Sequence, residues 1–190
     1  MSNIINGHEY VDLGLSVVWA TCNVGAQIPE EFGDYYAWGE IKPKRTFNEK
    51  TCETYEKVIG DISGTSRDAA RMEWGAPWRM PTREEFRELM YACEQEWIEN
   101  HGLCGKRLTG KTGNSIYFPV AGQRDWERLN YVGNTGYYWC SSPDENEKRE
   151  EEERNQLACV FKFVERTLFG CNSSDEYRYY GYQIRAVADI

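Results

Sequence analysis

The chain has 190 residues, enough for one domain with a well-buried core and short for two. Hydrophobic residues make up 41% of the chain and charged residues 28%, which is a globular rather than a disordered composition. The net charge of −9 argues against nucleic-acid binding, because phosphate recognition needs clustered Lys and Arg. Trp, Tyr and Phe reach 14%, a content that serves either a large core or a binding surface.

Targeting and metal signals are missing from the sequence. No apolar run is long enough to span a bilayer, and residues 1–10 lack the basic and apolar regions of a secretory signal. The seven cysteines are irregularly spaced and include no C-x-x-C pair, so they indicate neither a zinc site nor a full set of disulfides. We therefore expect no cofactor, no metal site, no membrane insertion and synthesis in the cytoplasm.

The N-terminal third reads as short strands separated by turns. Residues 10–13, 17–21 and 35–38 are β-prone runs bounded by Gly, Asn or Pro. The stretch 42–65 is polar and shows no clear period. A first short helix is expected at 66–74, with Ser66 as its N-cap and a glycine directly after its last residue.

A second helix is expected from the capping box formed by Thr82 and Glu85. An apolar stripe with helical spacing follows it, and the pair His101–Gly102 marks its expected exit. The stripe contains Phe86, Leu89, Met90, Cys93 and Trp97.

The C-terminal half returns to strands. A hairpin is expected within 108–118, and further strands at 137–141, 157–164 and 181–187. The charged segment 144–154 predicts an exposed loop or short helix, and a cation-binding or partner-docking loop is the alternative. Along 157–164 the side chains alternate, with Cys159, Phe161 and Phe163 on one face and Ala158, Val160 and Lys162 on the other.

No catalytic motif stands out. A G-x-S-x-G elbow, a P-loop, a G-x-G-x-x-G turn, an H-E-x-x-H pair and an EF-hand are all absent, and only two histidines occur. The local feature that does stand out is 171–182, where four tyrosines are interleaved with Ser, Asn and Asp. Such a mixture is typical of antibody-type binding surfaces. The alternative interpretation is a tyrosine-rich edge strand packed partly into the core.

A series of motifs covers nearly the whole chain and resembles one family. The series resembles the Fibrobacter-type major paralogous domain, abundant in gut Bacteroidota and related to the formylglycine-generating-enzyme branch of C-type-lectin-like folds. The motifs are YVDLGL at 10–15, WATCNVGA at 19–26, GDYYAWGE at 33–40, WRMPT at 78–82, LTG at 108–110, YYWCSS at 137–142 and GYQIRAV at 181–187. The resemblance implies an α+β fold with two helices and several short, mostly antiparallel strands.

The resemblance is less specific for function. The copper-binding cysteine segment of the catalytic relatives cannot be placed on Cys140, Cys159 or Cys171, and the calcium-site triplets of sugar-binding lectins are missing. The C-terminal third is similar to the variable proteins of diversity-generating retroelements, in which adenine-directed rewriting yields Ser, Tyr, Asp, Cys, Phe, Leu or Arg. Residues of these allowed types form the expected ligand-binding set: Cys159, Phe169, Cys171, Ser173, Ser174, Asp175, Tyr177, Tyr179, Tyr180 and Tyr182.

The sequence thus predicts a single C-type-lectin-like domain over 1–190, with a scaffold at 1–138 and a variable ligand-binding segment at 139–187. Arg178, Gly181 and Arg185 are assigned to the scaffold. The expected partner is a protein or glycan on another cell or particle. Display on a phage particle is expected, or on the cell surface if a signal has been removed. A formylglycine-generating-type oxidase and a non-diversified adhesin or structural module remain the alternatives.

Overall fold

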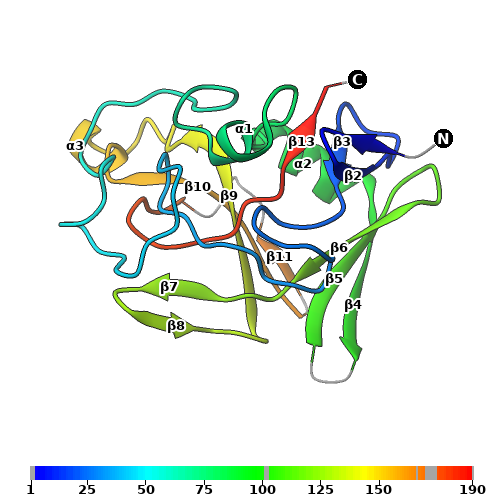
Figure 1. The fold of residues 1–190 in the computed structure, drawn as a ribbon. Helices are drawn as coiled ribbons and strands as arrows, with labels where there is room; N and C mark the ends of the chain where they lie inside the picture. Colours follow the sequence, from blue (N-terminus) through cyan, green and yellow to red (C-terminus); the bar gives the residue numbers. More distant parts are fainter. Residues whose placement is uncertain (1–2, 101–102, 166, 170–174, 190) are drawn as a thin grey trace.

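The computed structural model describes residues 3–100, 103–165, 167–169 and 175–189 (Figure 1). Over these residues the chain forms three helices and thirteen short strands, and every strand ladder is antiparallel. The α+β class with mostly antiparallel strands that the sequence predicts is therefore confirmed, whereas the predicted count of two helices is wrong: a third helix of four residues, Glu151–Arg154, forms in the charged segment.

The elements have the following bounds. The helices are α1 Ala69–Trp74, α2 Arg83–Ala92 and α3 Glu151–Arg154. The strands are β1 Ile4–Ile5, β2 His8–Val11, β3 Val18–Ala20, β4 Glu94–Asn100, β5 Leu103–Thr109, β6 Ser115–Pro119, β7 Gln123–Asp125, β8 Arg128–Asn130, β9 Thr135–Pro143, β10 Leu157–Val164, β11 Thr167–Phe169, β12 Asp175–Tyr177 and β13 Val187–Ala188.

Strand β10 is the central strand of its sheet. β9 pairs with one edge of β10, while β12 and β11 pair with opposite ends of its other edge. Its side chains alternate between two faces, as the sequence predicts, and both faces are buried over most of the strand. Val160 packs into one hydrophobic core with Trp38 and Trp139, and Phe161 packs into a second core with Phe86 of α2.

Three further strand groups surround this sheet. β1, β2 and β3 join the C-terminal β13, so that the two ends of the chain meet in one sheet (Figure 1). β4, β5 and β6 form a meander, and β7 and β8 form a separate hairpin. Figure 1 shows this hairpin beneath the chain that leads from β12 to β13.

The first helix begins later than the sequence predicts. Its N-cap is Asp68 rather than Ser66, and the Asp68 carboxylate accepts hydrogen bonds from the backbone N–H groups of Arg71, Gly64 and Met80. A buried carboxylate with three backbone donors is a better cap than an exposed hydroxyl. The helix ends before Gly75, as expected, where φ is +76°.

The second helix has the predicted capping box but ends earlier than its apolar stripe suggests. Thr82 and Glu85 satisfy each other's backbone N–H groups. Cys93 is already extended, and the following seven residues pair with β5 along their whole length. Trp97 therefore lies in β4 and not on the helix, which corrects the prediction. Strand pairing satisfies the backbone of 94–100 as fully as a longer helix would.

Two other expectations from the C-terminal half have different outcomes. The predicted strand at 181–187 is replaced by single bridges from Gly181, Tyr182 and Gln183 to three different segments, before β13 begins. The charged segment 144–154 is largely exposed and contains the short α3, which confirms the simpler of its two interpretations.

No helix within the described ranges has the length and apolar character needed to cross a membrane.

Candidate functional site

Four tyrosines from two distant parts of the chain meet at the surface; we refer to them as the tyrosine cluster. They are Tyr55, Tyr177, Tyr179 and Tyr180. The rings of Tyr177 and Tyr179 stack with centroids 5.2 Å apart, and Tyr179 makes edge contacts with Tyr55 at 5.4 Å and with Tyr180 at 4.8 Å. Tyr177 is 39% exposed, and the other three are partly buried. The cluster is thus a pre-packed aromatic surface.

Arg178 anchors the turn that carries three of the clustered tyrosines. Its guanidinium is buried and donates hydrogen bonds to the carbonyl oxygens of Leu157 at 3.0 Å, Lys57 at 2.8 Å and Thr54 at 3.2 Å. It also lies over the ring of Trp38, 4.4 Å from the centroid. Residues 177–180 form a turn, closed by a hydrogen bond from the Tyr180 N–H to the Tyr177 carbonyl oxygen, and the buried Arg178 side chain anchors this turn to the core. The scaffold role predicted for Arg178 agrees with these contacts.

The other two residues assigned to the scaffold also lie inside. Arg185 is fully buried and donates to Asn23 Oδ1 and to backbone oxygens that include those of Thr21 and Tyr117. Gly181 does not adopt a left-handed turn. It is required for close approach, because a Cβ there would lie 2.7 Å from the Phe47 ring.

The β7–β8 hairpin lies beside the tyrosine cluster. Backbone hydrogen bonds in both directions between Arg124 and Gly181 hold the hairpin beside the tyrosine cluster. Tyr180 contacts Tyr182, Tyr182 stacks on Tyr137 at 4.8 Å, and the Tyr137 ring reaches Tyr131. A chain of rings therefore connects the cluster to the hairpin.

Two exposed aromatic residues of the hairpin region have unusual backbone conformations. Trp126 is 54% exposed with φ of +53°, and Tyr131 is 55% exposed with φ of +61°. Bulky residues rarely adopt this region, and such outliers concentrate at functional sites. The sequence analysis missed both residues, and also Tyr55. The one signal in the sequence that could have indicated Trp126 and Tyr131 is that they flank a very short strand, β8.

Asp175, a predicted site residue, acts as a tether. Its carboxylate pairs with Arg149 at 2.8 Å and with Arg83 at 3.3 Å, and Arg149 also binds the buried Asp144 at 2.6 Å. Burial raises the pKa of Asp175, and the Arg149 hydrogen bond acts in the opposite direction. These ion pairs fix the start of β12 against the loop before α3, so Asp175 positions the neighbouring tyrosines rather than facing a ligand.

The prediction is wrong for two residues of the binding set, because they do not lie at the surface. Cys159 and Tyr182 are fully buried, because β10 is covered on both faces and the Tyr182 ring fills the core beside Trp139. Large parts of the predicted variable segment, 139–142 and 157–161, are likewise buried. The side chain of Phe169 and all of Cys171, Ser173 and Ser174 lie outside the described residues. Of the predicted set, the structure brings Tyr177, Tyr179 and Tyr180 together at the surface.

The hydroxyls of the partly buried tyrosines remain protonated at neutral pH. Burial and the neighbouring Tyr180 raise the pKa of Tyr179, and burial raises the pKa of Tyr180. Each hydroxyl is therefore a neutral group that both donates and accepts hydrogen bonds. Together with the ring faces, this gives a surface suited to polar ligands with apolar edges.

Two cysteine thiols meet in the second core. The Sγ atoms of Cys140 on β9 and Cys159 on β10 are 3.0 Å apart, and both residues are fully buried. No group of three or more His, Cys, Asp or Glu side chains among the described residues is arranged to hold a metal ion.

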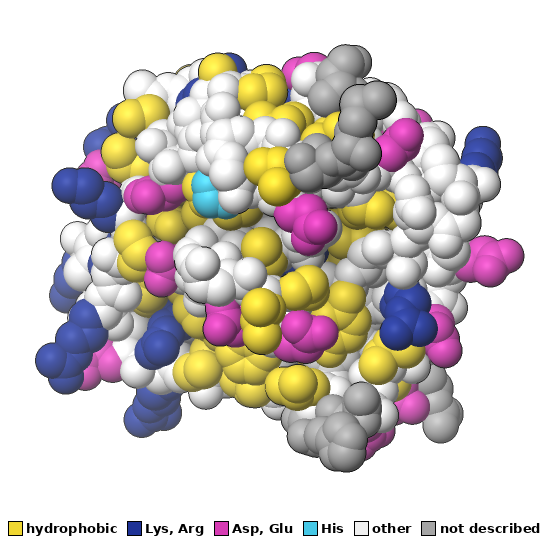
Figure 2. All heavy atoms as spheres, turned by 45° about the vertical axis from the view of Figure 1, so that its right-hand side comes forward, with side chains coloured by type: hydrophobic (Ala, Val, Ile, Leu, Met, Phe, Trp, Pro, Cys, Tyr) yellow, Lys and Arg dark blue, Asp and Glu magenta, His cyan; other side chains and the backbone are white. Residues whose placement is uncertain are grey.

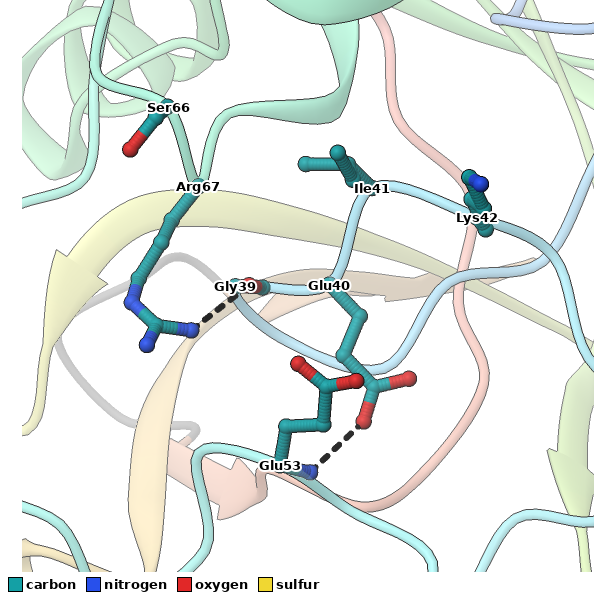
Figure 3. Close-up of a pocket in the computed structure, with 7 residues that line it drawn as sticks. All are labelled: Gly39, Glu40, Ile41, Lys42, Glu53, Ser66 and Arg67. Atoms are coloured by element: carbon teal, nitrogen blue, oxygen red, sulfur yellow. Dashed lines mark hydrogen bonds between the residues drawn. The ribbon is translucent and has the colours of Figure 1, made fainter.

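The surface also carries a pocket of about 460 Å³ (Figure 3). Arg67 extends along one wall and donates to the Gly39 carbonyl at 3.5 Å, while Glu40 accepts from the backbone N–H of Glu53 at 2.8 Å. Lys42 lines the opposite wall. Charges of both signs line this pocket, so it favours neither an anion nor a cation.

The face drawn in Figure 2 has a mixed chemical character. Hydrophobic side chains reach the surface mainly in its lower part, with acidic side chains between them.

Comparison with known proteins adds no relative: no protein-family model, no curated protein and no solved structure matches this chain. A functional proposal therefore has to rest on the geometry of the site and on the motifs of the chain.

Proposed function

We propose that this chain is a non-catalytic ligand-recognition domain of C-type-lectin-like fold, and that it is the diversified variable protein of a diversity-generating retroelement. The tyrosine cluster is its binding surface, and Trp126 and Tyr131 form one border. The ligand is a protein or glycan on another cell or particle.

One observation carries the proposal: a buried arginine holds a segment whose tyrosines stack at the surface. Tyr177 and Tyr179 lie on either side of Arg178, whose side chain is anchored by hydrogen bonds to the backbone oxygens of Leu157, Thr54 and Lys57. The backbone is therefore positioned before a ligand arrives, which removes ordering entropy from binding. Tyrosine gives large contact area with few rotatable bonds, as in antibody paratopes.

The cysteine pair does not favour the oxidase alternative. Cys140 and Cys159 are the thiols that come together among the described residues, and both are fully buried. A peptide substrate has no access to either sulfur atom. A recognition domain is the function that the exposed side chains favour.

The binding proposal is tested by replacing Tyr177, Tyr179 and Tyr180 together with alanine. We expect binding to a glycan panel and to intact bacterial cells to be lost, while the free energy of unfolding falls by no more than about 2 kcal/mol, since all three are at least partly exposed. The matched control is Tyr182→Ala, which removes a buried ring and should cost about 4 kcal/mol. Unchanged binding in the triple variant, or no saturable binding by the unaltered protein, would contradict the proposal.

The retroelement proposal has a separate test. Sequencing of the neighbouring gene region should find a reverse transcriptase and a near-copy of the 3′ end that differs at adenines. Among related clones, positions 177, 179 and 180 should vary, whereas the buried positions 159 and 182 should stay constant. Variation at the buried positions with constancy at the surface would overturn the assignment.

A further inference from the structure

A second pocket, of about 240 Å³, lies between β2, the end of α1 and the loop that contains Asp34. None of the residues of the tyrosine cluster lines it, so it is independent of the proposed function. Its wall includes the ring of Trp74, on which His8 stacks with centroids 3.9 Å apart. An apolar wall of this kind suits the methylene stem of a ligand.

The floor of this pocket holds a hydroxyl without a partner. Tyr36 is 1% exposed and lines the pocket, and its hydroxyl makes no hydrogen bond to any described residue. The Tyr36 oxygen is not among the described buried polar atoms that lack a partner, so this hydroxyl keeps some accessible surface, and the pocket that Tyr36 lines is where it is reached. A ligand atom at this position would satisfy it.

The charge of the pocket is negative. Asp34 and Glu73 line it, and neither forms an ion pair with a described residue. After burial, these two carboxylates are the causes that raise the pKa of Tyr36, so both lie within electrostatic reach of its hydroxyl. No Lys or Arg lines the pocket, and burial lowers the pKa of His8, which keeps its imidazole neutral at pH 7.

We propose that this pocket binds a primary alkylammonium group, the end group of a lysine side chain. An ammonium has three N–H donors, and the pocket offers three oxygen-bearing groups, on Asp34, Glu73 and Tyr36. The alkyl stem would lie against the stacked rings of Trp74 and His8. A guanidinium is disfavoured because it prefers a planar fork of acceptors, whereas the carboxylates of Asp34 and Glu73 come from two separate segments.

The test is an NMR titration of the full chain with n-butylammonium, observed at the Trp74 indole N–H. We expect a saturable shift, with no saturable shift from n-butanol and a weaker response to tetramethylammonium, which has no N–H donor. A shift of equal size with n-butanol, or no saturable shift with n-butylammonium, would overturn the proposal.

Variants identify the groups that bind the cation. Asp34→Asn and Glu73→Gln should each weaken n-butylammonium binding about fivefold, and Tyr36→Phe should weaken it without removing charge. The matched control is Glu84→Gln on α2, an exposed acid outside the pocket, which should leave binding unchanged. Equal affinity in all of these folded variants would contradict the assignment.

The source of the amine is tested with two further probes. Nα-acetyl-lysine amide should bind more tightly than glucosamine, because only the former has a flexible stem; the reverse order would overturn the lysine assignment. The triple tyrosine variant should bind n-butylammonium normally. Failure of the binding surface and failure of the pocket are thereby distinguishable.

Discussion

Arg178 shows how a single residue can prepare a binding surface. Its charge is buried, and burial lowers its pKa to about 10, yet three short hydrogen bonds to backbone oxygens and the Trp38 ring keep it inside. Removing it would take one hydrogen-bond donor away from each of these carbonyl oxygens. Its position between Tyr177 and Tyr179 links core stability directly to the orientation of the surface.

Replacing Trp126 tests whether its strained backbone is retained because its exposed ring contacts the ligand. Trp126→Asn should raise the free energy of unfolding by up to about 1 kcal/mol, because Asn tolerates the left-handed region better than Trp. The same change should weaken cell binding, because it removes an exposed ring. Both effects are measured by urea denaturation and a cell-binding assay.

Leu129→Asn is the control for this prediction, since Leu129 is exposed on the same hairpin and lacks a positive φ. It should give no gain in stability. A destabilised Trp126→Asn protein with unchanged binding would show that the ring serves the fold.

At the scale of elements, the binding surface depends on one close contact between two segments. The chain at Gly181 pairs with Arg124 of β7 and lies against the ring of Phe47. This contact fixes the distance between the tyrosine cluster and the hairpin. The backbone of the surface is therefore set by packing that the surface side chains do not make themselves.

Gly181→Ala should separate these segments. A Cβ at this position would lie 2.7 Å from both the Phe47 ring and the Arg124 Cβ atom, so we expect a loss of about 1–3 kcal/mol in the free energy of unfolding and weaker ligand binding. Gly60→Ala is the matched control, because Gly60 has open space around it and no positive φ. Equal stability of the two variants, measured by urea denaturation, would contradict this account.

For the whole molecule, the central sheet joins two hydrophobic cores. Neighbouring residues of β10 point into different cores, Val160 into one and Phe161 into the other. The two cores therefore share one set of backbone hydrogen bonds. We expect them to unfold together, as small single domains usually do.

Truncation of each core tests this cooperativity. Val160→Ala should cost about 2 kcal/mol and Phe161→Ala about 4 kcal/mol, each within one unfolding transition. Near-UV circular dichroism and tryptophan fluorescence should give the same midpoint for each variant. Two separate midpoints would show that the cores unfold independently.

The sequence by itself determined the α+β class, the capping box at Thr82 and Glu85, the alternation along β10 and the exposure of the charged segment 144–154. These features are local, because each depends on the spacing of residues along one short stretch of chain. Arg178 and Arg185 were also assigned to the scaffold from the sequence, and the structure places both of them inside.

The tertiary structure alone decided which aromatic residues face outward. Tyr180 and Tyr182 are close in sequence, yet the second fills the core because Tyr36 and Trp139 surround it. The end of α2 was likewise decided by β5, which pairs with the following residues. Side-chain exposure and strand pairing depend on segments far apart in the sequence. The periodicity within one segment does not specify which distant segments will pack against it.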